Sequence, residues 1–334
     1  MGSHRRLVPS GFDRGATALC VLSAAAAALG AVPAAAAPHG GTRAEVDRLY
    51  HEAENATEAF DRAGERAGAL RREVVQAQDH IARQQERINT MREALGSLAG
   101  AQYRSGGIDP TVALLFSDDP ADYLDRASTL DRIGAHQAEQ LRKLRSAMRE
   151  LAQERAETAA KLADLEKSRK SVESHKRIVE RKLARARQLL NSLPAAERAA
   201  YERASRGSGP PDLSGAVAPD ARTAAAVAAA RSALGRPYVW GANGPSGFDC
   251  SGLMQWSYAH AGVHLPRTSQ EQRYAGRQIP LSQARPGDLV VYRSDASHVA
   301  MYVGNGRVIH APYPGAPVRY DPVGMMPVSS VTRV

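Results

Sequence analysis

Three side chains in the C-terminal third of this sequence are suited to nucleophilic catalysis: Cys250, His298 and His310. A cysteine thiolate attacks carbonyl carbons, provided that a base removes its proton and a third group orients that base. The two histidines can supply the base and the orienting group, because imidazole gains and loses protons near neutral pH. The sequence therefore indicates a cysteine hydrolase in which one thiol and two imidazoles meet in space.

Cys250 is expected at the start of a helix over residues 249–263, directly after the loop residues Gly247 and Phe248. The first turn of a helix has free N–H groups and partial positive charge, which favour a thiolate over a thiol. The same N–H groups can stabilise the oxyanion that forms when a thiolate attacks a carbonyl. We therefore expect a reactive thiolate at Cys250.

Plainer interpretations of the same residues remain open at this point. A single cysteine is commonly a small buried apolar side chain, and a single histidine is more often structural than catalytic. Zinc binding by one cysteine and two histidines is a further possibility, but no paired ligand spacing supports it. We expect neither a metal nor an organic cofactor.

The N-terminal residues 1–37 have the features of a secretory signal peptide. Three arginines flank an apolar run over 15–32, and small residues follow as far as Ala37, the expected cleavage position. A membrane anchor is a second interpretation of this run, which is short for a membrane span. Cleavage would remove Cys20, the other of two cysteines, and leave a single thiol that forms no internal disulfide. We expect a secreted protein associated with the cell wall.

The two histidines fall on predicted strands. Residues 287–293, 298–304 and 307–311 have strand patterns, and Gly304-Asn305-Gly306 is a hairpin turn signal. For His298 and His310 to share a face of the sheet, the turn must contain three residues, with Val303 opposite Arg307 and Ala300 opposite His310. Helices over 220–234 and 249–263 precede these strands, which predicts an α+β domain over 220–334.

Three segments of this domain resemble the NlpC family of peptidoglycan endopeptidases, which have a reduced papain-like fold. The motifs are aromatic-Trp-Gly, Asp-Cys-Ser-Gly, Gly-Asp-Leu, His-Val and Asn-Gly-x-x-Ile-His, and they cover most of 225–315. The segments that contain them are "GRPYVWGANGPSGFDCSGLMQWSYAHAGVHLPRTSQEQ", "RPGDLVVYR" and "SHVAMYVGNGRVIHAP".

The resemblance implies a role for each matching residue. The nucleophile falls on Cys250, the base on His298 and the orienting third residue on His310. Tyr238, before Trp-Gly, matches a tyrosine that lies close to the nucleophile, while Asp249 and Ser251 flank the cysteine and help to shape the substrate subsite. The activity implied is hydrolysis of cell-wall stem peptides, usually at the bond from the side-chain carboxyl of D-glutamate to meso-diaminopimelate.

Residues 43–103 contain an apolar repeat in steps of three and four without a proline, which predicts a coiled-coil helix. A second, looser series begins at Tyr123 and ends at Leu193. We expect an antiparallel coiled-coil hairpin over 43–204, with a tip segment at 104–120 that contains helix-breaking glycines and prolines. The second helix is longer than the first, and its excess around Lys182 to Arg203 has no evident partner. We predict that the part near Leu183 to Leu193 covers the catalytic cleft.

A linker rich in Gly, Pro and Ser over 205–219 joins the hairpin to the catalytic domain. The tip contains an apolar group, which either caps the hairpin or docks a partner. A long hairpin before such a domain is similar to the secreted cell-wall hydrolases of actinobacteria and other Gram-positive bacteria. That similarity implies regulation by the coiled coil and docking of a division-associated membrane complex on the tip residues Val112, Leu114, Leu115 and Phe116.

Charge limits the possible partners. The net charge is +9, and residues 220–334 hold 11 Arg, no Lys and 6 acidic residues, a balance that suits an anionic surface such as peptidoglycan. No nucleic-acid-binding module is present in the sequence, so we expect no nucleic-acid partner. Two alternatives to an endopeptidase are an amidase on the same fold, which cuts the sugar–peptide link, and a non-enzymatic wall-binding adaptor.

Overall fold

The computed structural model describes residues 40–104, 120–205 and 211–334. The predicted signal peptide, nearly all of the tip segment and part of the predicted linker lie outside these residues, including the tip residues Val112, Leu114, Leu115 and Phe116. Within the described part of the chain, no helix combines the length and the apolar character needed to cross a membrane.

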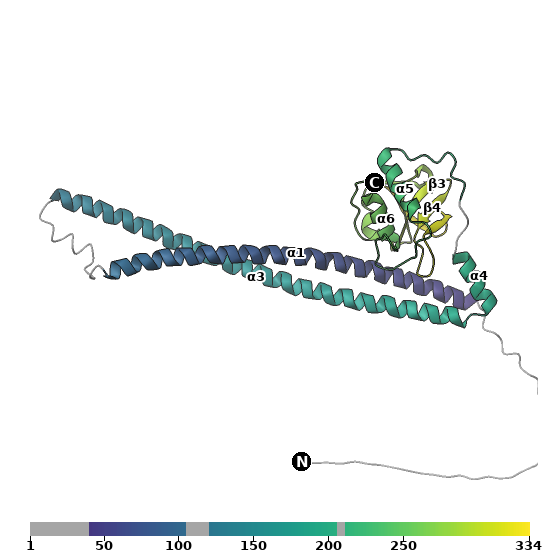
Figure 1. Ribbon diagram of the computed structural model, residues 1–334, viewed down its shortest axis with the longest axis horizontal. Coiled ribbons are helices and arrows are strands. Elements are labelled where there is room, and N and C mark those ends of the chain that lie inside the picture. The colour runs from purple at the N-terminus through teal and green to yellow at the C-terminus, as the bar shows by residue number, and fades with distance from the viewer. Residues whose placement is uncertain (1–39, 105–119, 206–210) are drawn as a thin grey trace, which may run out of the picture. The chain divides into compact units, whose positions relative to one another are not determined.

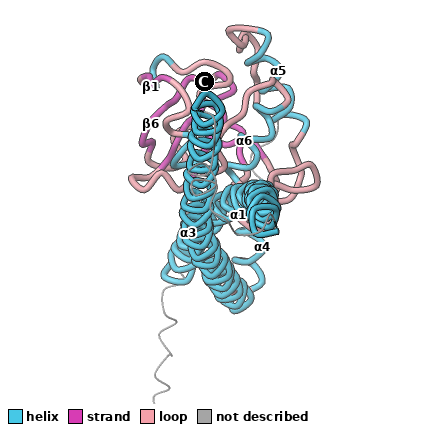
Figure 2. Tube along the Cα trace, turned by 90° about the vertical axis from the view of Figure 1, so that its left-hand side faces the viewer, coloured by secondary structure: helices cyan, strands magenta, loops and turns pink. Residues whose placement is uncertain are grey.

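Two long helices make up most of the N-terminal half, α1 (Gly40–Arg104) and α3 (Pro120–Ser192). They lie side by side and run antiparallel (Figures 1 and 2). Ion pairs join facing positions of the two helices, for example His80 with Glu154 at 2.5 Å and Glu73 with Lys161 at 3.0 Å. The predicted fold class, long antiparallel helices followed by an α+β domain, is confirmed.

The apolar residues of these helices are unequally buried. Val46, Leu49 and Ala53 are buried, and they pack against Val179 and Leu183 of α3. The prediction that the end of the second helix has no partner is therefore wrong, because α1 starts early enough to cover it. Pro194 follows the end of α3, and a separate helix, α4 (Ala195–Ser205), continues the chain.

The C-terminal domain is built on a six-stranded antiparallel sheet with the order β1-β6-β2-β3-β4-β5. The strands are β1 (Arg277–Ile279), β2 (Leu289–Tyr292), β3 (His298–Gly304), β4 (Arg307–His310), β5 (Arg319–Pro322) and β6 (Val328–Arg333). A 3-10 turn, η1 (Leu281–Gln283), follows β1. Sequence patterns predicted β2, β3 and β4, whereas β1, β5 and β6 were not predicted.

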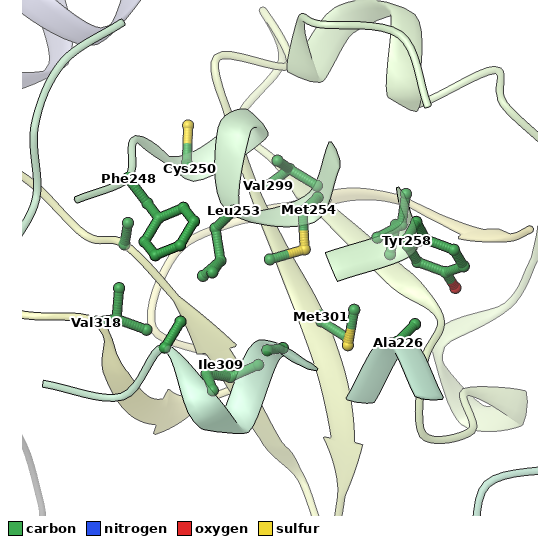
Figure 3. Close-up of a cluster of buried hydrophobic side chains, with 14 of the residues drawn as sticks. Ala226, Phe248, Cys250, Leu253, Met254, Tyr258, Val299, Met301, Ile309 and Val318 are labelled. Carbon is green, nitrogen blue, oxygen red and sulfur yellow. The ribbon is translucent and has the colours of Figure 1, made fainter. Parts of the chain in front are cut away.

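Two helices, α5 (Ala221–Ser232) and α6 (Cys250–Ala259), pack on one face of the sheet, and the short α7 (Ser269–Gln272) follows. Leu253 and Met254 of α6 meet Val299 and Met301 of β3 in a continuous apolar core, while the Cys250 sulfur points away from it (Figure 3). Burial of such side chains stabilises the fold by about 1.5–3 kcal/mol each. This core fixes the N-terminal end of α6, and with it Cys250, beside the sheet.

The β3–β4 hairpin sets the faces of the two histidines. Met301 pairs with Ile309 and Tyr302 with Val308, so the predicted register is correct along the strands. The closing pair is Gly304 with Arg307, not Val303, because a bulge precedes the two-residue turn Asn305-Gly306. Both turn residues have positive φ, at 51° and 67°, as tight hairpin turns require.

Candidate active site

Cys250 is the first residue of α6, and its position depends on two neighbours. The Asp249 carboxylate caps the helix and accepts a hydrogen bond of 2.7 Å from the Gly252 N–H. A Cβ at Gly252 would lie 2.2 Å from the Ala242 carbonyl oxygen, so only glycine lets the loop pack this close. Cys250 is consequently held with 2 % of its surface exposed.

His298 and His310 come from neighbouring strands and are hydrogen bonded to each other. His298 Nε2 lies 2.8 Å from His310 Nδ1, and both rings are almost completely buried. Cys250 Sγ lies within 4.8 Å of a ring nitrogen of His298. The structure thus brings together the three residues that the sequence singled out, in the order cysteine, histidine, histidine.

The histidine pair continues into a buried carboxylate from β5. His310 Nε2 lies 2.9 Å from Asp321 Oδ2, and Arg319 Nε contacts the same oxygen at 2.8 Å. Burial raises the pKa of Asp321, but the hydrogen bonds and charges of His310 and Arg319 outweigh it, and the net shift is downward. Burial lowers the pKa of His310 to about 4, although Asp321 opposes that shift.

A carboxylate from α1 occupies the other end of the pair. Glu54 Oε1 lies 2.8 Å from His298 Nδ1, and Glu54 Oε2 lies 2.5 Å from Arg293 Nη1. Burial alone would raise the pKa of Glu54, but the charges of His298 and Arg293 bring it below its ordinary value. An ionised carboxylate therefore occupies Nδ1, the ring nitrogen of His298 that is not bonded to His310.

A second α1 carboxylate, Glu58, lies directly over the nucleophile. Its Oε1 accepts a 3.0 Å hydrogen bond from Ser251 Oγ and is 3.7 Å from Cys250 Sγ, and its Oε2 accepts from the Ser269 N–H at 2.8 Å. Burial and the nearby charge of Asp249 raise the pKa of Glu58 to about 8. Glu58 therefore covers the thiol and binds polar groups on both sides of it.

The third α1 carboxylate, Asp61, joins a buried group around Arg267. Arg267 Nη1 and Nη2 donate to the two oxygens of Asp249 at 3.0 and 2.5 Å, and Nη1 also donates to Ser251 Oγ at 2.9 Å. Asp61 Oδ2 lies 3.1 Å from Nη2. Burial and the Asp249 charge raise the pKa of Asp61 to about 8, against the opposing effect of Arg267. We call Glu54, Glu58 and Asp61 the acidic strip of α1.

Aromatic side chains flank the acidic strip on both sides. Tyr50 stacks on Tyr313 with ring centroids 5.0 Å apart, and Phe60 meets the Trp240 ring edge-on at 5.2 Å. A cavity of about 420 Å³ reaches Glu54 and His310 from the Tyr50 side. The strip is thus anchored at both ends by apolar contacts.

The expectation of a thiolate at Cys250 is wrong for this arrangement. Burial raises the thiol pKa well above its usual value, and the charges of Glu58, Glu54 and Asp249 raise it further. A hydrogen bond from the Val299 N–H acts in the opposite direction but is outweighed. The helix N-terminus that the sequence indicated is present, but three carboxylates around the sulfur dominate its electrostatics.

The other predicted site residues also lie near Cys250. Tyr238 is buried, and its pKa is raised well above normal by burial and then by the charge of Cys250. Asp249 and Ser251 flank the nucleophile, as the sequence requires, and both are buried by contacts with Arg267 or the acidic strip. Their predicted role in a substrate subsite stays a prediction.

One set of donor atoms at this site has the spacing of metal ligands. Among the described residues, an oxygen of Glu54, Cys250 Sγ and a nitrogen of His298 lie within 4.8 Å of one another. Here Glu54 and His298 hydrogen bond to each other, which already satisfies both groups. We therefore assign no metal to the site.

Sequence reasoning missed the acidic strip, Arg267 and Asp321. Glu54, Glu58 and Asp61 are spaced by four and three residues, so they share one face of α1. That spacing is a signal, but in a helix dense in balanced charge it equally predicts a solvated face. Nothing in the sequence links residue 54 with residue 298, which is 244 positions away.

A buried thiol at a helix start, with an imidazole pair beside it on an antiparallel sheet, defines the site of a cysteine peptidase. Comparison with protein families agrees with this class and specifies it. Residues 235–331 match the NlpC/P60 family, and the chain therefore carries an NlpC/P60 cysteine-peptidase domain, as predicted.

Individual relatives match over the same part of the chain. A probable endopeptidase of Corynebacterium glutamicum is 44 % identical over 118 residues, which are 35 % of this chain and 56 % of that protein. The peptidoglycan endopeptidase RipA of Mycolicibacterium smegmatis is 48 % identical over 120 residues, covering 31 % and 24 %. The solved P60 domain of an M. avium subspecies paratuberculosis antigen is 38 % identical over 34 % of this chain and 93 % of that one, with a TM-score of 0.32. The match spans about half or less of these two curated relatives.

Proposed function

We propose that this protein is a secreted cysteine endopeptidase that hydrolyses the stem peptides of peptidoglycan. The observation that carries the proposal is the meeting of Cys250, His298 and His310 inside an NlpC/P60 domain. The basic balance of residues 220–334 suits an anionic polymer. The bond from the D-glutamate side-chain carboxyl to meso-diaminopimelate is the substrate bond that the family resemblance favours.

The residues act in a two-step acyl transfer. His298 Nδ1 takes the proton of Cys250, and the thiolate attacks the carbonyl carbon, with backbone N–H groups at the start of α6 holding the oxyanion. The same imidazolium then protonates the leaving amine as the C–N bond breaks, which leaves a thioester on Cys250. Water, deprotonated by His298, hydrolyses the thioester and restores the thiol.

We further propose that α1 holds this site inactive. Glu54 occupies the nitrogen that serves as the base, Glu58 covers the sulfur, and both suppress thiolate formation by their charge. A substrate carbonyl cannot reach a thiol with 2 % exposure. The covering element is α1, not residues 183–193 of the second helix as the sequence predicted.

Activation therefore requires α1 to leave the domain. Two expectations from the sequence indicate where and how α1 could be released. Residues 1–37 would direct export, and a division-associated membrane complex would dock on the tip residues Val112 to Phe116. A force or a binding event at the tip would act on α1, because α1 runs continuously from the acidic strip toward that segment. We propose both on the sequence pattern and the family resemblance.

The test is digestion of a stem peptide, L-Ala-γ-D-Glu-meso-diaminopimelate, by the full chain and by Glu54→Gln, read by mass spectrometry. Glu54→Gln removes one charge of the buried pair with Arg293 and weakens the contact between α1 and the domain by about 2–5 kcal/mol. α1 is then released more often, and we expect cleavage to rise roughly 100-fold. The expected product is L-Ala-γ-D-Glu. Glu73→Gln is the matched control, because Glu73 lies on the same helix and pairs with Lys161 of α3.

Each outcome separates the two parts of the proposal. Cleavage at equal rates by both chains would refute inhibition by Glu54 and leave the peptidase. Cleavage that survives Cys250→Ala would refute the nucleophile. A different product, such as a peptide freed from its sugar, would identify an amidase instead.

A further inference from the structure

The histidine pair ends in a carboxylate on each side, and the two carboxylates have opposite effects. Glu54 belongs to α1 and blocks the pair, whereas Asp321 belongs to the catalytic domain itself. We propose that Asp321 is a fourth member of the catalytic relay, a positioning residue that fixes the tautomer of His310 and thereby keeps His298 Nδ1 available as the base. The inference rests on the proposed function, since it assigns a role within that mechanism.

The sheet places Asp321 for this role. In the β4–β5 register, His310 pairs with Arg319 and Val308 pairs with Asp321, so Asp321 lies diagonally across from His310 on the same face. The result is the 2.9 Å contact between His310 Nε2 and Asp321 Oδ2. Asp321 is 9 % exposed and His310 1 %, so water does not replace this contact.

Hydrogen-bond counting then determines which nitrogens carry protons. An ionised carboxylate only accepts, so His310 Nε2 must carry the proton of its bond to Asp321. A neutral His310 then has a bare Nδ1, which accepts from His298 Nε2–H across 2.8 Å. While Glu54 is in place, its ionised carboxylate accepts from His298 Nδ1, so both ring nitrogens of His298 carry protons. Once Glu54 has left, a neutral His298 keeps its proton on Nε2 and has a bare Nδ1, the nitrogen that takes the thiol proton.

The reverse assignment would disable the base. If His310 carried its proton on Nδ1, it would donate to His298 Nε2, and the proton of His298 would move to Nδ1. That nitrogen could no longer accept a proton from Cys250. Asp321 excludes this assignment because it offers no proton to His310 Nε2, and Arg319 keeps it ionised through contacts from two of its nitrogens.

The experiment replaces the carboxylate by an amide of the same shape. Asp321→Asn can turn its NH₂ toward His310 Nε2 and stabilise the wrong tautomer. It is made in the full chain and in the full chain with Glu54→Gln, where we expect release of α1 to expose the thiol. The matched control is Asp288→Asn, a buried carboxylate of the same domain that pairs with Arg333 at 2.7 Å and lies outside the site.

Two readouts are measured across pH 5 to 10. One is the rate at which iodoacetamide alkylates Cys250, which reports the thiolate and needs no substrate. At pH 7 we expect Asp321→Asn to slow alkylation about tenfold, corresponding to a loss of about one pKa unit of thiolate stabilisation. Near pH 10 the rates converge, because the thiolate then forms without help. The other readout is kcat/KM on the stem peptide, which falls with little change in KM.

The outcomes are distinct. Equal alkylation profiles for Asp321→Asn and Asp288→Asn would overturn the role of Asp321. An alkylation profile lowered equally at every pH would indicate altered access to the thiol and would also overturn it. If no chain cleaves the stem peptide but the alkylation profile shifts as expected, the proposed substrate is wrong and the relay through Asp321 stands.

Discussion

Two stretches of α1 follow the same apolar repeat and have different environments. Between Val46 and Asp61, the residues Val46, Leu49 and Ala53 are buried against α3, and three carboxylates on an adjoining face are buried against the catalytic domain. Farther along, Leu98 is 39 % exposed, and Leu141 and Met148 of α3 are similarly open. The repeat alone keeps Val74 and Ile88 buried in the helix pair, whereas the burial of the three carboxylates requires a third body to pack on α1.

The same contrast applies to charge. Glu52 and Glu73 make ion pairs at the surface of the helix pair with Lys182 and Lys161, where such pairs contribute little. Glu54, Glu58 and Asp61 are buried beside Cys250, where each unpaired charge is expensive. The near stretch of α1, from Val46 to Asp61, is therefore an interface with the catalytic domain, and its strength depends on the protonation and pairing of a few groups. The far stretch of α1, from Glu73 to Leu98, pairs with α3.

The largest effect is expected when the cation that contacts one stretch of α1 is removed and compared with the cation that contacts the other stretch. Arg267→Met leaves the carboxylates of Asp249 and Asp61 without their buried partner, so the free energy of unfolding should fall by about 3–5 kcal/mol. Arg155→Met removes an exposed contact with Gln85 in the far stretch and should change it by less than about 0.5 kcal/mol. Thermal unfolding followed by circular dichroism measures both.

A rescue distinguishes lost pairing from lost packing. Adding Asp61→Asn to Arg267→Met removes a carboxyl group that the folded protein must keep protonated far above its ordinary pKa, so part of the stability should return. If the double variant is as unstable as Arg267→Met alone, Asp61 is not coupled to Arg267 and the strip ends at Glu58.

The sequence carried enough information for the domain core and the reactive residues, and not for what surrounds them. Periods of two and of three to four residues predicted β2 to β4 and the long helices, because local patterns reflect which side faces a core. The contact of Glu54 with His298 joins residues 244 positions apart and depends on how α1 meets the domain. Asp321 was missed because β5 is short and ends in Pro322, and its partner His310 is identified only by register.

Smaller effects are expected from apolar truncations. Val46 is fully buried between α1 and α3, so Val46→Ala should cost about 2 kcal/mol for two lost methyl groups and the space they leave. Leu98→Ala removes more atoms but from a half-open position, and it should cost less than about 1 kcal/mol. Urea unfolding compares them, and equal costs would show that the far stretch is buried in solution.

An effect of pH follows from the raised pKa values of Glu58 and Asp61 in the acidic strip. Glu58 and Asp61 each have a pKa of about 8 when buried, against ordinary values of 4.5 and 3.8. The buried state therefore binds more protons than the released state, so inhibition is fully present below the ordinary values and is lost as pH rises through about 8. Each proton changes the release equilibrium by up to tenfold per pH unit.

The groups that face these two carboxylates act in both directions: the Asp249 charge raises both pKa values, whereas Ser251 and Ser269 lower that of Glu58 and Arg267 lowers that of Asp61. Glu58 meets Cys250, whose pKa is also raised, and Asp249, Ser251 and the Ser269 N–H, while Asp61 meets Arg267 and Asp249. Glu54 opposes them, because its lowered pKa weakens inhibition only in acid, below about pH 4.5. Inhibition by the strip should consequently be strongest at about pH 4.5.

Cleavage itself depends on pH, so the quantity to measure is the ratio of rates between the full chain and Glu54→Gln at each pH, in which the catalytic ionisations cancel. From pH 6 to pH 7 this ratio should rise by up to about a hundredfold, tenfold for each of the two protons released. Glu58→Gln removes one titrating group, so the rise should be shallower in that variant, and Glu86→Gln, in the exposed far stretch, should leave it unchanged. A ratio independent of pH would show that Glu58 and Asp61 are ionised when buried, and that Arg267 and the surrounding hydrogen bonds alone compensate their charge.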